Sequence, residues 1–335
     1  MEVDRDRAVD AASAAFQAHG STTDDARLTA EVLVSADACG KHSHGLLRLP
    51  RFVQGIKYGN VDPDGAIEVV RERRGVATID GGSRLGPVVA SMTASEAMDR
   101  ADANGIGAVG VHNSNHLGML GYYTDKIRDE GYISVAMTNT EPAMPPHGGV
   151  EPLLGTNPIA IGLPTDPPFN LDMSTSAIAR GTVLHKKETN EELPEGVALD
   201  TAGEPTTDPE AALEGTILPF GGAKGSGLAI AVEVLAGGLV GAAMGEDVTG
   251  TYHTKAPCTK GDLFLVLDPS VLSSGADFVK AAGAFLEDLK ATETAAGFDE
   301  IRLPGERSVE RDLAADAVEI EDALWEEVRD LAGGN

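Results

Sequence analysis

The sequence predicts an α/β protein with helical ends. Apolar residues make up 42 % of the 335 residues, which is normal for a folded chain with a sizeable core. Strand-like and helix-like apolar patterns alternate through the middle of the chain, whereas both ends carry helical spacing. Interleaved strands and helices are typical of the α/β class.

The N-terminal part is expected to be helical. Helical spacing covers residues 4–19 and 22–38, and Gly40 suits the end of the second helix because glycine readily adopts the left-handed conformation of a C-terminal stop. A shorter helix is expected around residues 46–59, with Pro50 in its first turn, where the missing N–H has no intrahelical partner to lose.

The middle of the chain predicts a sheet with covering helices. Strands are expected at residues 66–81 (as a pair), 107–115, 132–140, 157–165, 169–174 and 262–268. Helices are expected at residues 88–105, 122–131, 225–245, 278–292 and 308–334. The apolar run 225–245 reads as one long, mostly buried helix. Residues 186–196 read as an exposed loop, and 201–215 have the composition of turns.

The composition limits the partners. A net charge of −27 repels nucleic acid and anionic membranes, so neither partner is expected. The acidic residues are dispersed along the chain, which favours adaptation to high salt over a merely acidic surface. No stretch approaches 18 uncharged apolar residues, and we expect no transmembrane helix. The N-terminus lacks signal-peptide order and there are only two cysteines, so the expected location is cytoplasmic.

One glycine motif excludes a familiar cofactor fold. Gly105, Gly107 and Gly110 form a literal GxGxxG. The dinucleotide fingerprint needs a strand before the motif and a helix after it, but here the order is reversed. We therefore expect no Rossmann fold, and these glycines are expected to close a helix and begin a strand.

Two compact histidine clusters are the strongest chemical signal. The stretch KHSHGLLR contains His42 and His44, with Arg48 four residues after the second, and HNSNH contains His112 and His116. The motifs lack a nearby glutamate in a metal-ligand arrangement, so we expect no metal. Each histidine alone could be a hydrogen-bonded loop residue. Together with the arginine, they indicate a place where an anion is held.

The stretch GGAKGSG, residues 221–227, precedes the long apolar helix. Its backbone amides and Lys224 could hold a phosphate at the start of that helix, although it is not a P-loop and could also be a flexible connection. No GxSxG elbow surrounds a serine, and neither cysteine has a protease-like context, so nucleophilic hydrolysis is unsupported.

Seven sequence blocks in one order carry a resemblance to a family. They are KHSHGLLRLPRF, GAVGVHNSNHLGMLGYY, LLGTNPIAIGLPT, LDMSTSAIARG, LPEGVALDTAGEPTTDP, LPFGGAKGSGLAIAVEVLAG and LPGERS. Together they resemble the malate/L-lactate dehydrogenase family of non-Rossmann NAD(P)-dependent oxidoreductases, from about residue 4 to 330. That group also contains sulfolactate and ureidoglycolate dehydrogenases, diketogulonate reductase and piperideine-2-carboxylate reductase.

The resemblance implies a division of labour along the chain. Residues 1–70 with 310–335 would form a helical substrate and dimerisation domain, and residues 71–309 a mixed-sheet NAD(P)-binding region of non-Rossmann type. Members of the family are usually homodimers, so a homodimer is expected.

The resemblance also implies roles for residues. His44 and His116 are the candidate catalytic histidines, and which one accepts the proton stays open; Ser43 orients His44. Arg48 is the expected clamp for the substrate carboxylate and Thr156 a further substrate contact. Phe52 stands where several relatives carry tyrosine. The implied cofactor-binding residues are His116, Asp172, Met173, Ser174, Thr175, Ser176, Lys224, Gly225, Pro304, Gly305 and Glu306.

The expected reaction is hydride transfer between NAD or NADP and a small 2-hydroxy or 2-keto acid, with malate and L-lactate the leading substrates. A histidine suits the proton transfer because its ordinary pKa is about 6.5, and arginine suits a carboxylate because it binds in a bidentate way. Arg51 or Lys41 could hold a second carboxylate. The alternatives are a reductase of a cyclic imino acid or a diketo sugar acid, or a non-catalytic scaffold protein.

Overall fold

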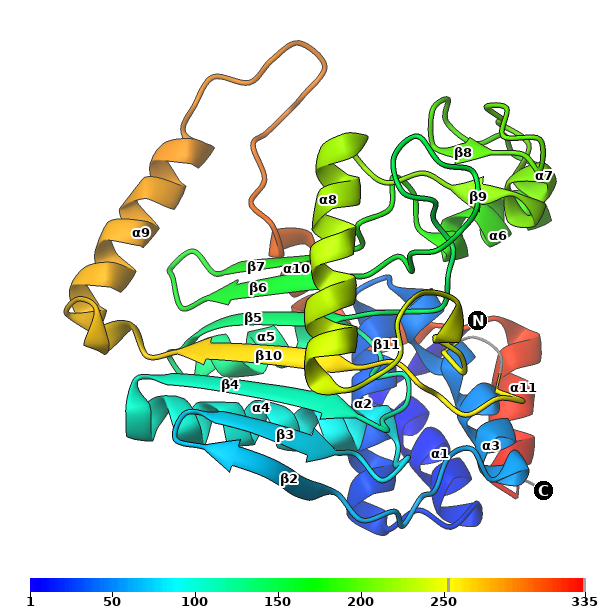
Figure 1. Cartoon of the computed structure of the whole chain (residues 1–335), viewed down its shortest axis with the longest axis horizontal. Coiled ribbons are helices and arrows are strands. Elements are labelled where there is room, and N and C mark those ends of the chain that lie inside the picture. The colour runs from blue at the N-terminus through cyan, green and yellow to red at the C-terminus, as the bar shows by residue number, and fades with distance from the viewer. Residues whose placement is uncertain (252–253, 334–335) are drawn as a thin grey trace.

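A mixed seven-stranded sheet forms the centre of the molecule (Figure 1). The computed structural model describes residues 1–251 and 254–333. The strand order is β2-β3-β4-β10-β5-β6-β7, with β3 and β4 parallel and every other neighbouring pair antiparallel. The strands are β2 Glu68–Arg73, β3 Val76–Asp80, β4 Ile106–His112, β5 Ile133–Thr138, β6 Ile159–Leu163, β7 Phe169–Met173 and β10 Asp262–Leu267. The predicted α/β class is confirmed.

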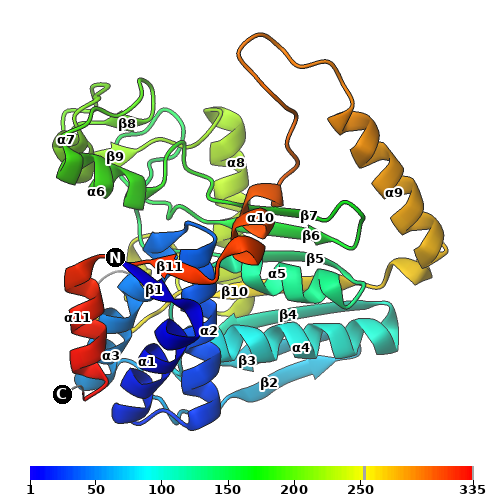
Figure 2. The same cartoon turned by 180° about the vertical axis from the view of Figure 1, so that it is seen from behind.

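Helices α4 (Gly86–Asn104) and α5 (Leu120–Asp129) cover one face of the sheet (Figure 2). Val109, Phe264 and Tyr123 are almost fully buried between them and the sheet. On the opposite face α8 (Ala223–Val232) crosses the strands (Figure 1). The face under α4 and α5 is therefore buried, whereas much of the face that α8 crosses is partly exposed.

The GxGxxG segment has the structure that its order predicted. Gly105 ends α4 in the left-handed conformation with φ of 80°, and β4 begins at the next residue. A Cβ atom on Gly107 would lie 1.9 Å from the carbonyl oxygen of Ala97, so glycine is needed where the strand meets the helix. The expectation against a Rossmann fold is confirmed.

Both ends of the chain build one helical layer beside the sheet (Figure 2). The layer contains α1 (Arg5–Ala18), α2 (Thr23–Ala38), α3 (Leu49–Tyr58) and α11 (Asp322–Leu331), and the short strands β1 (Glu2–Asp4) and β11 (Ala317–Glu319) pair antiparallel. Phe16, Leu33 and Trp325 share its core. The division into two domains at the stated boundaries stays a prediction.

The last part of the chain differs from the expected single helix at 308–334. Helix α10 (Glu306–Ala314) ends, β11 pairs with β1, and α11 follows. The prediction was wrong because the strand Ala317–Glu319 is too short to leave a period in the sequence, and its pairing partner lies at the opposite end of the chain.

The loop and turns expected at 186–196 and 201–215 lie in a small lobe (Figure 1), where residues 190–196 are mostly exposed and non-helical and turns occur at 201–203. Helix α6 (Arg180–Thr189) runs into the first of the expected ranges and ends at Asn190, whose φ is 55°. The lobe also contains β8 (Ala198–Leu199), α7 (Pro209–Glu214) and β9 (Thr216–Ile217). Its small core includes the buried Val183 and Leu193. The sequence pattern did not predict this packing, because helix α6 is strongly polar.

The apolar run 225–245 is neither one helix nor mostly buried. Helix α8 ends at Val232, a π-helical turn follows at Glu233–Gly237, and a 3-10 turn ends at Val240. Val234 and Leu239 are 52 % and 65 % exposed. The helix packs against the sheet through one side only, so its apolar outer side faces away from the core.

Within the described residues, the helical run Ala223–Val240 is long and apolar enough to cross a membrane by length and composition alone. It carries Lys224 and the buried Glu233, and 44 % of it is buried. This is weak evidence for a membrane span, since the core helices of other proteins pass the same test. The last long helix, α9 (Gly275–Lys290), projects from the end of the sheet beyond β10 (Figure 1).

Candidate active site

Two short 3-10 turns, His42–His44 and Leu46–Arg48, connect α2 to α3 and carry the first histidine cluster. Leu46 is fully buried in the helical core, which anchors the turns. Ser43 Oγ lies 2.9 Å from His44 Nδ1, and Arg48 Nε donates to the carbonyl oxygen of Ser43 at 2.7 Å. The serine, the histidine and the arginine therefore form one connected unit.

The second cluster reaches the same place from the loop after β4. The rings of His44 and His116 have centroids 5.7 Å apart. The backbone N–H of Gly118 donates to His116 Nδ1 at 3.0 Å, which fixes the ring. His112 lies at the end of β4 beside Asp80 and takes no part in this pair. No three His, Cys, Asp or Glu side chains gather as a metal site in the described parts of the chain.

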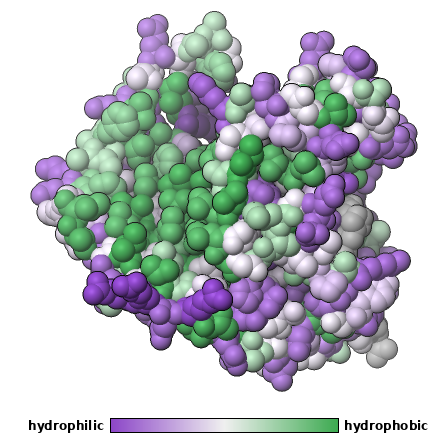
Figure 3. Space-filling view, viewed as in Figure 1, coloured by the Kyte–Doolittle hydropathy of each residue, from purple (hydrophilic) through white to green (hydrophobic). Residues whose placement is uncertain are grey.

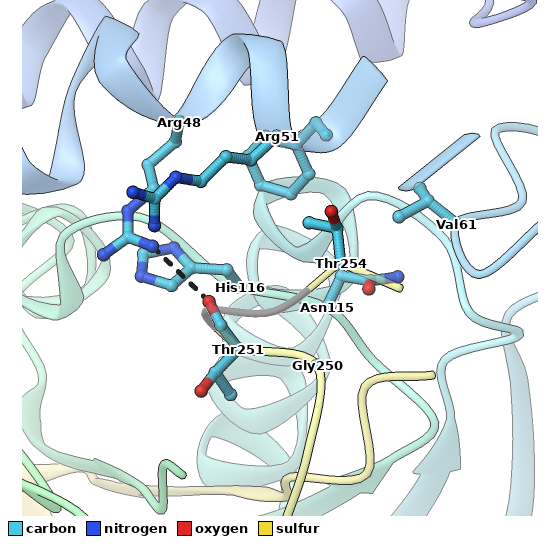
Figure 4. Close-up of a pocket in the computed structure, with 9 residues that line it drawn as sticks. Arg48, Arg51, Val61, Asn115, His116, Gly250, Thr251 and Thr254 are labelled. Carbon is cyan, nitrogen blue, oxygen red and sulfur yellow. Dashed lines mark hydrogen bonds between the residues drawn. The ribbon is translucent and has the colours of Figure 1, made fainter. Parts of the chain in front are cut away.

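A pocket opens beside this pair (Figure 4). Its lining residues are Arg48, Arg51, Phe52, Val61, Asn115, His116, Gly250, Thr251 and Thr254. Arg48 and Arg51 reach in from the α3 side, opposite the segment that holds Thr251 (Figure 4). Arg48 Nη1 donates to the carbonyl oxygen of Thr251 at 3.4 Å. The pocket therefore combines two guanidinium groups with one of the two facing imidazoles.

Both imidazoles favour the neutral state. Burial, followed by the positive charge of Arg48, lowers the pKa of His44 to about 4. Burial and Arg48 also lower the pKa of His116 well below its usual range, with His44 adding to the effect. Positive charge in the pocket at neutral pH is therefore carried by the arginines, and each histidine is ready to take part in proton transfer or hydrogen bonding.

Asp172 lies at the end of β7 and pairs with Lys41, with Nζ and Oδ2 2.5 Å apart. The sequence left Lys41 open as a partner for a second substrate carboxylate, but its ammonium group is held by this aspartate. The negative charge of Asp172 raises the pKa of His44 and the positive charge of Lys41 lowers it, so the pair partly cancels at the imidazole.

A separate set of backbone hydrogen bonds links Thr156, Thr175 and the start of α8. Thr175 N–H donates to the carbonyl oxygen of Thr156 at 2.8 Å, and Phe220 N–H donates to that of Thr175 at 3.0 Å. The chain then enters α8, whose second and third residues are Lys224 and Gly225. Thr156 does not line the pocket described above. Thr156 and the start of α8 are therefore joined to each other through backbone bonds.

The remaining predicted residues lie around β7. Met173 ends the strand; beyond it, Ser174 and Ser176 hydroxyl oxygens are 2.8 Å apart. The carbonyl oxygen of Pro304 accepts from Asn170 N–H at 3.0 Å, which places Pro304–Glu306 against β7. Burial raises the pKa of Glu306, but hydrogen bonds from Lys290 and from the N–H of Leu303 to its carboxylate together outweigh burial and hold the pKa below the usual range. Gly305 precedes α10 with φ of 95°.

Sequence reasoning missed part of the pocket wall. Asn115 lies inside the HNSNH motif, but the sequence assigned it no role. In the structure its side-chain amide donates to the carbonyl oxygens of Ser83 and Arg84. Thr251 and Thr254 come from a segment about 200 residues after Arg48 that carries no motif. Only the folded chain brings them to the site. Phe52 lines the pocket and packs edge-on against Phe16 with ring centroids 6.0 Å apart.

Comparison with known proteins shows the family of the chain. The sequence model of the family described as malate/L-lactate dehydrogenase matches residues 3–329. The chain belongs to this family. The resemblance read from the seven sequence blocks is therefore confirmed, and the mixed sheet with its helical layer is the fold of the family.

Individual relatives carry more specific names. The chain is 43 % identical over 320 residues to the malate/(S)-sulfolactate dehydrogenase of Methanothermus fervidus, covering 95 % of this chain and 93 % of the relative. It is 36 % identical to the (2R)-3-sulfolactate dehydrogenase (NADP(+)) of Chromohalobacter salexigens, covering 96 % and 95 %. The solved structure of sulfolactate dehydrogenase from Methanocaldococcus jannaschii superposes with a TM-score of 0.96 at 39 % identity, covering 100 % and 98 %.

The lowered pKa of His44 can be tested without any substrate. In an NMR titration of the histidine ring signals, His44 is expected to stay neutral down to about pH 4, because burial and Arg48 disfavour the imidazolium. Arg48→Gln removes the nearby positive charge and is expected to raise that pKa. A His44 that titrates near its ordinary value in the native protein contradicts the buried, neutral site.

Proposed function

We propose that the chain is an NAD(P)-dependent dehydrogenase of small 2-hydroxy acids, and that His44, His116 and Arg48 form its reactive centre. The observation that carries the proposal is the meeting of two neutral imidazoles beside Arg48, next to a pocket that His116 and Arg48 line. Oxidation of a 2-hydroxy acid removes a proton from oxygen and a hydride from carbon. Bound NAD(P) supplies the hydride acceptor.

The hydrogen bonds of the two histidines favour different roles. Because Gly118 N–H occupies His116 Nδ1, the neutral ring carries its hydrogen on Nε2 and can donate to the substrate oxygen. His44 has Ser43 Oγ at Nδ1; when that nitrogen donates to the serine, Nε2 keeps a lone pair. We therefore assign proton acceptance to His44 and orientation of the substrate oxygen to His116.

The two arginines favour a substrate with two anionic groups. Arg48 suits the carboxylate beside the reacting carbon, since its planar guanidinium can bind in a bidentate way. Arg51 lines the same pocket and can meet a second carboxylate or a sulfonate. The names of the relatives, which include malate and sulfolactate, agree with this choice. Of the substrates expected from the sequence, malate is retained, sulfolactate is added and L-lactate becomes the poorer fit.

The start of α8 fits the phosphates of a dinucleotide. Lys224 is exposed there, and the first N–H groups of a helix have no intrahelical partner, so both are suitable donors to phosphate oxygens. Gly221 and Gly222 have φ of 56° and 62°, which lets the backbone present those donors. Thr175 and Thr156 continue from this place towards β6 and β7. We propose these residues as the cofactor contacts.

The uncovered sheet face supports assembly as a homodimer. Figure 3 shows apolar side chains spread over this face beside α8. Ile230 is exposed on α8, and Val234 and Leu239 are exposed on the turns that continue it. Half-buried apolar residues of the strands continue the surface; they include Val135, Ile159, Ile161, Leu163 and Leu265. Apolar patches of this extent mark interaction surfaces. A second copy presents the same apolar face, so each copy can cover the patch of the other without placing a charged group against it.

The same proposal includes a cytoplasmic, salt-adapted protein without nucleic-acid or membrane partners. Cys39 and Cys258 are both free, and burial as the main cause raises the pKa of each thiol to about 11, so both are inert thiols. The net charge of −27 supports both salt adaptation and the lack of anionic partners.

His44→Ala is expected to lower turnover by about 10²–10⁴-fold, because the proton acceptor is lost. His116→Gln keeps a side-chain N–H donor and is expected to lose less. The measurement is the absorbance of reduced cofactor with malate and sulfolactate, in high salt, with His185→Asn on exposed α6 as the control. A larger loss for His116→Gln than for His44→Ala reverses the assignment of the two rings.

Arg51→Gln is expected to raise KM for malate and sulfolactate by about 10–100-fold, because a hydrogen bond to a charged group is lost. Lactate has no second anionic group, so its KM is expected to change little and serves as the internal control. An equal rise for all three substrates argues against a contact between Arg51 and the second anion.

Leu239→Glu with Val234→Glu is expected to shift the protein from a dimer to a monomer of 34.6 kDa, because charge on both copies of the apolar face opposes their contact. Light scattering after size exclusion in high salt measures the mass. Gln17→Glu, exposed on α1, is the control. A wild-type protein that is already monomeric removes this part of the proposal.

A further inference from the structure

Asp37 is a buried carboxylate in the last turn of α2, with a side chain only 5 % exposed. Burial of a carboxylate is costly unless its oxygens accept hydrogen bonds. Nothing in the proposed reaction uses this group directly, since it does not line the pocket. The reason for burying Asp37 must therefore lie in the residues that it contacts.

The two oxygens of Asp37 hold the two ends of the turn that carries His44. Oδ1 lies 3.1 Å from His42 Nδ1, and Oδ2 accepts from the backbone N–H of Leu46 at 2.7 Å. Ser43 and His44 lie between these two attachment points. One rigid helix thus fixes both ends of a five-residue segment through a single side chain.

Gly45 shows how closely the carboxylate fits against the turn. A Cβ atom at this position would lie 2.2 Å from Asp37 Oδ1 and 2.4 Å from Oδ2. The φ of Gly45 is −89°, outside the left-handed region, so the sign of φ does not explain the glycine, whereas the approach of the carboxylate does. The glycine that follows the two histidines in the sequence is therefore explained by Asp37.

We propose that Asp37 is a positioning residue that sets the place of His44, Ser43 and Arg48 by clamping the turn from His42 to Leu46. Arg48 is included because its Nε donates to the carbonyl oxygen of Ser43, inside the clamped segment. The inference rests on the function proposed above, and it adds a residue on a different helix that acts through the backbone of the turn.

Asp37→Ala is expected to lower kcat by about 10–100-fold, because small displacements of reacting groups are costly, while KM for NAD(P) stays unchanged. Asp37→Asn keeps an acceptor for Leu46 N–H and is expected to recover most of the lost kcat. Val9→Ala, a core truncation in α1 away from the turn, controls for general loss of stability. If Asp37→Ala and Val9→Ala reduce kcat equally at matched thermal stability, the positioning role is overturned.

A double-mutant cycle tests the contact with Gly45. Gly45→Ala alone is expected to lower kcat strongly, because the new methyl group displaces the carboxylate. In the Asp37→Ala protein the same change is expected to add little, since the group it would strike is gone, so the two effects are coupled. Effects that simply multiply contradict the proposal.

A readout without substrate separates this inference from the proposed function. In the NMR titration, Asp37→Ala is expected to raise the pKa of His44 from about 4 towards its ordinary value, because a released turn exposes the ring. Asp37→Asn is expected to leave it unchanged. If the native protein lacks dehydrogenase activity but this shift occurs, the clamp stands and the proposed function fails. If His44 titrates identically in all three proteins, the clamp itself fails.

Discussion

The burial of two imidazole rings beside Arg48 is the constraint on which the site depends. Removal from water and the adjacent guanidinium both penalise a charged ring, so His44 and His116 are neutral at ordinary pH. In the proposed reaction, charge and proton affinity are thereby separated: the arginines would attract the anion, and a neutral nitrogen would remain for the proton. A solvent-exposed histidine pair could itself carry positive charge, so the same groups would have to attract the anion and accept the proton.

The fold creates that burial by joining two layers. Arg48 and His44 come from turns rooted in the helical layer, whereas His116 follows a strand of the central sheet. The ion pair of Lys41 with Asp172 of β7 crosses the same junction, 2.5 Å from nitrogen to oxygen. The site therefore exists only where the helical layer and the sheet are correctly packed against each other.

Much of this arrangement was predictable from the sequence, and the failures have physical reasons. The reversed GxGxxG, the covering helices and the histidine–arginine cluster are local patterns, and the structure contains all three. The strand β11 was missed because its pairing partner is over 300 residues away. Thr251 was missed because a bare backbone carbonyl beside Arg48 leaves no trace in composition. Asp37 was missed because its role depends on a turn that begins five residues later and ends nine residues later.

The pairing of β1 with β11 has a consequence for how the protein is made. Val3 is opposite Val318, and the buried Trp325 and Val328 complete the core around α1 and α2. While the chain is still being synthesised, the first two helices therefore lack the residues that cover their apolar sides. The layer that carries His44 can close only after α11 has been synthesised, so a chain that lacks α11 leaves the N-terminal helices without their cover.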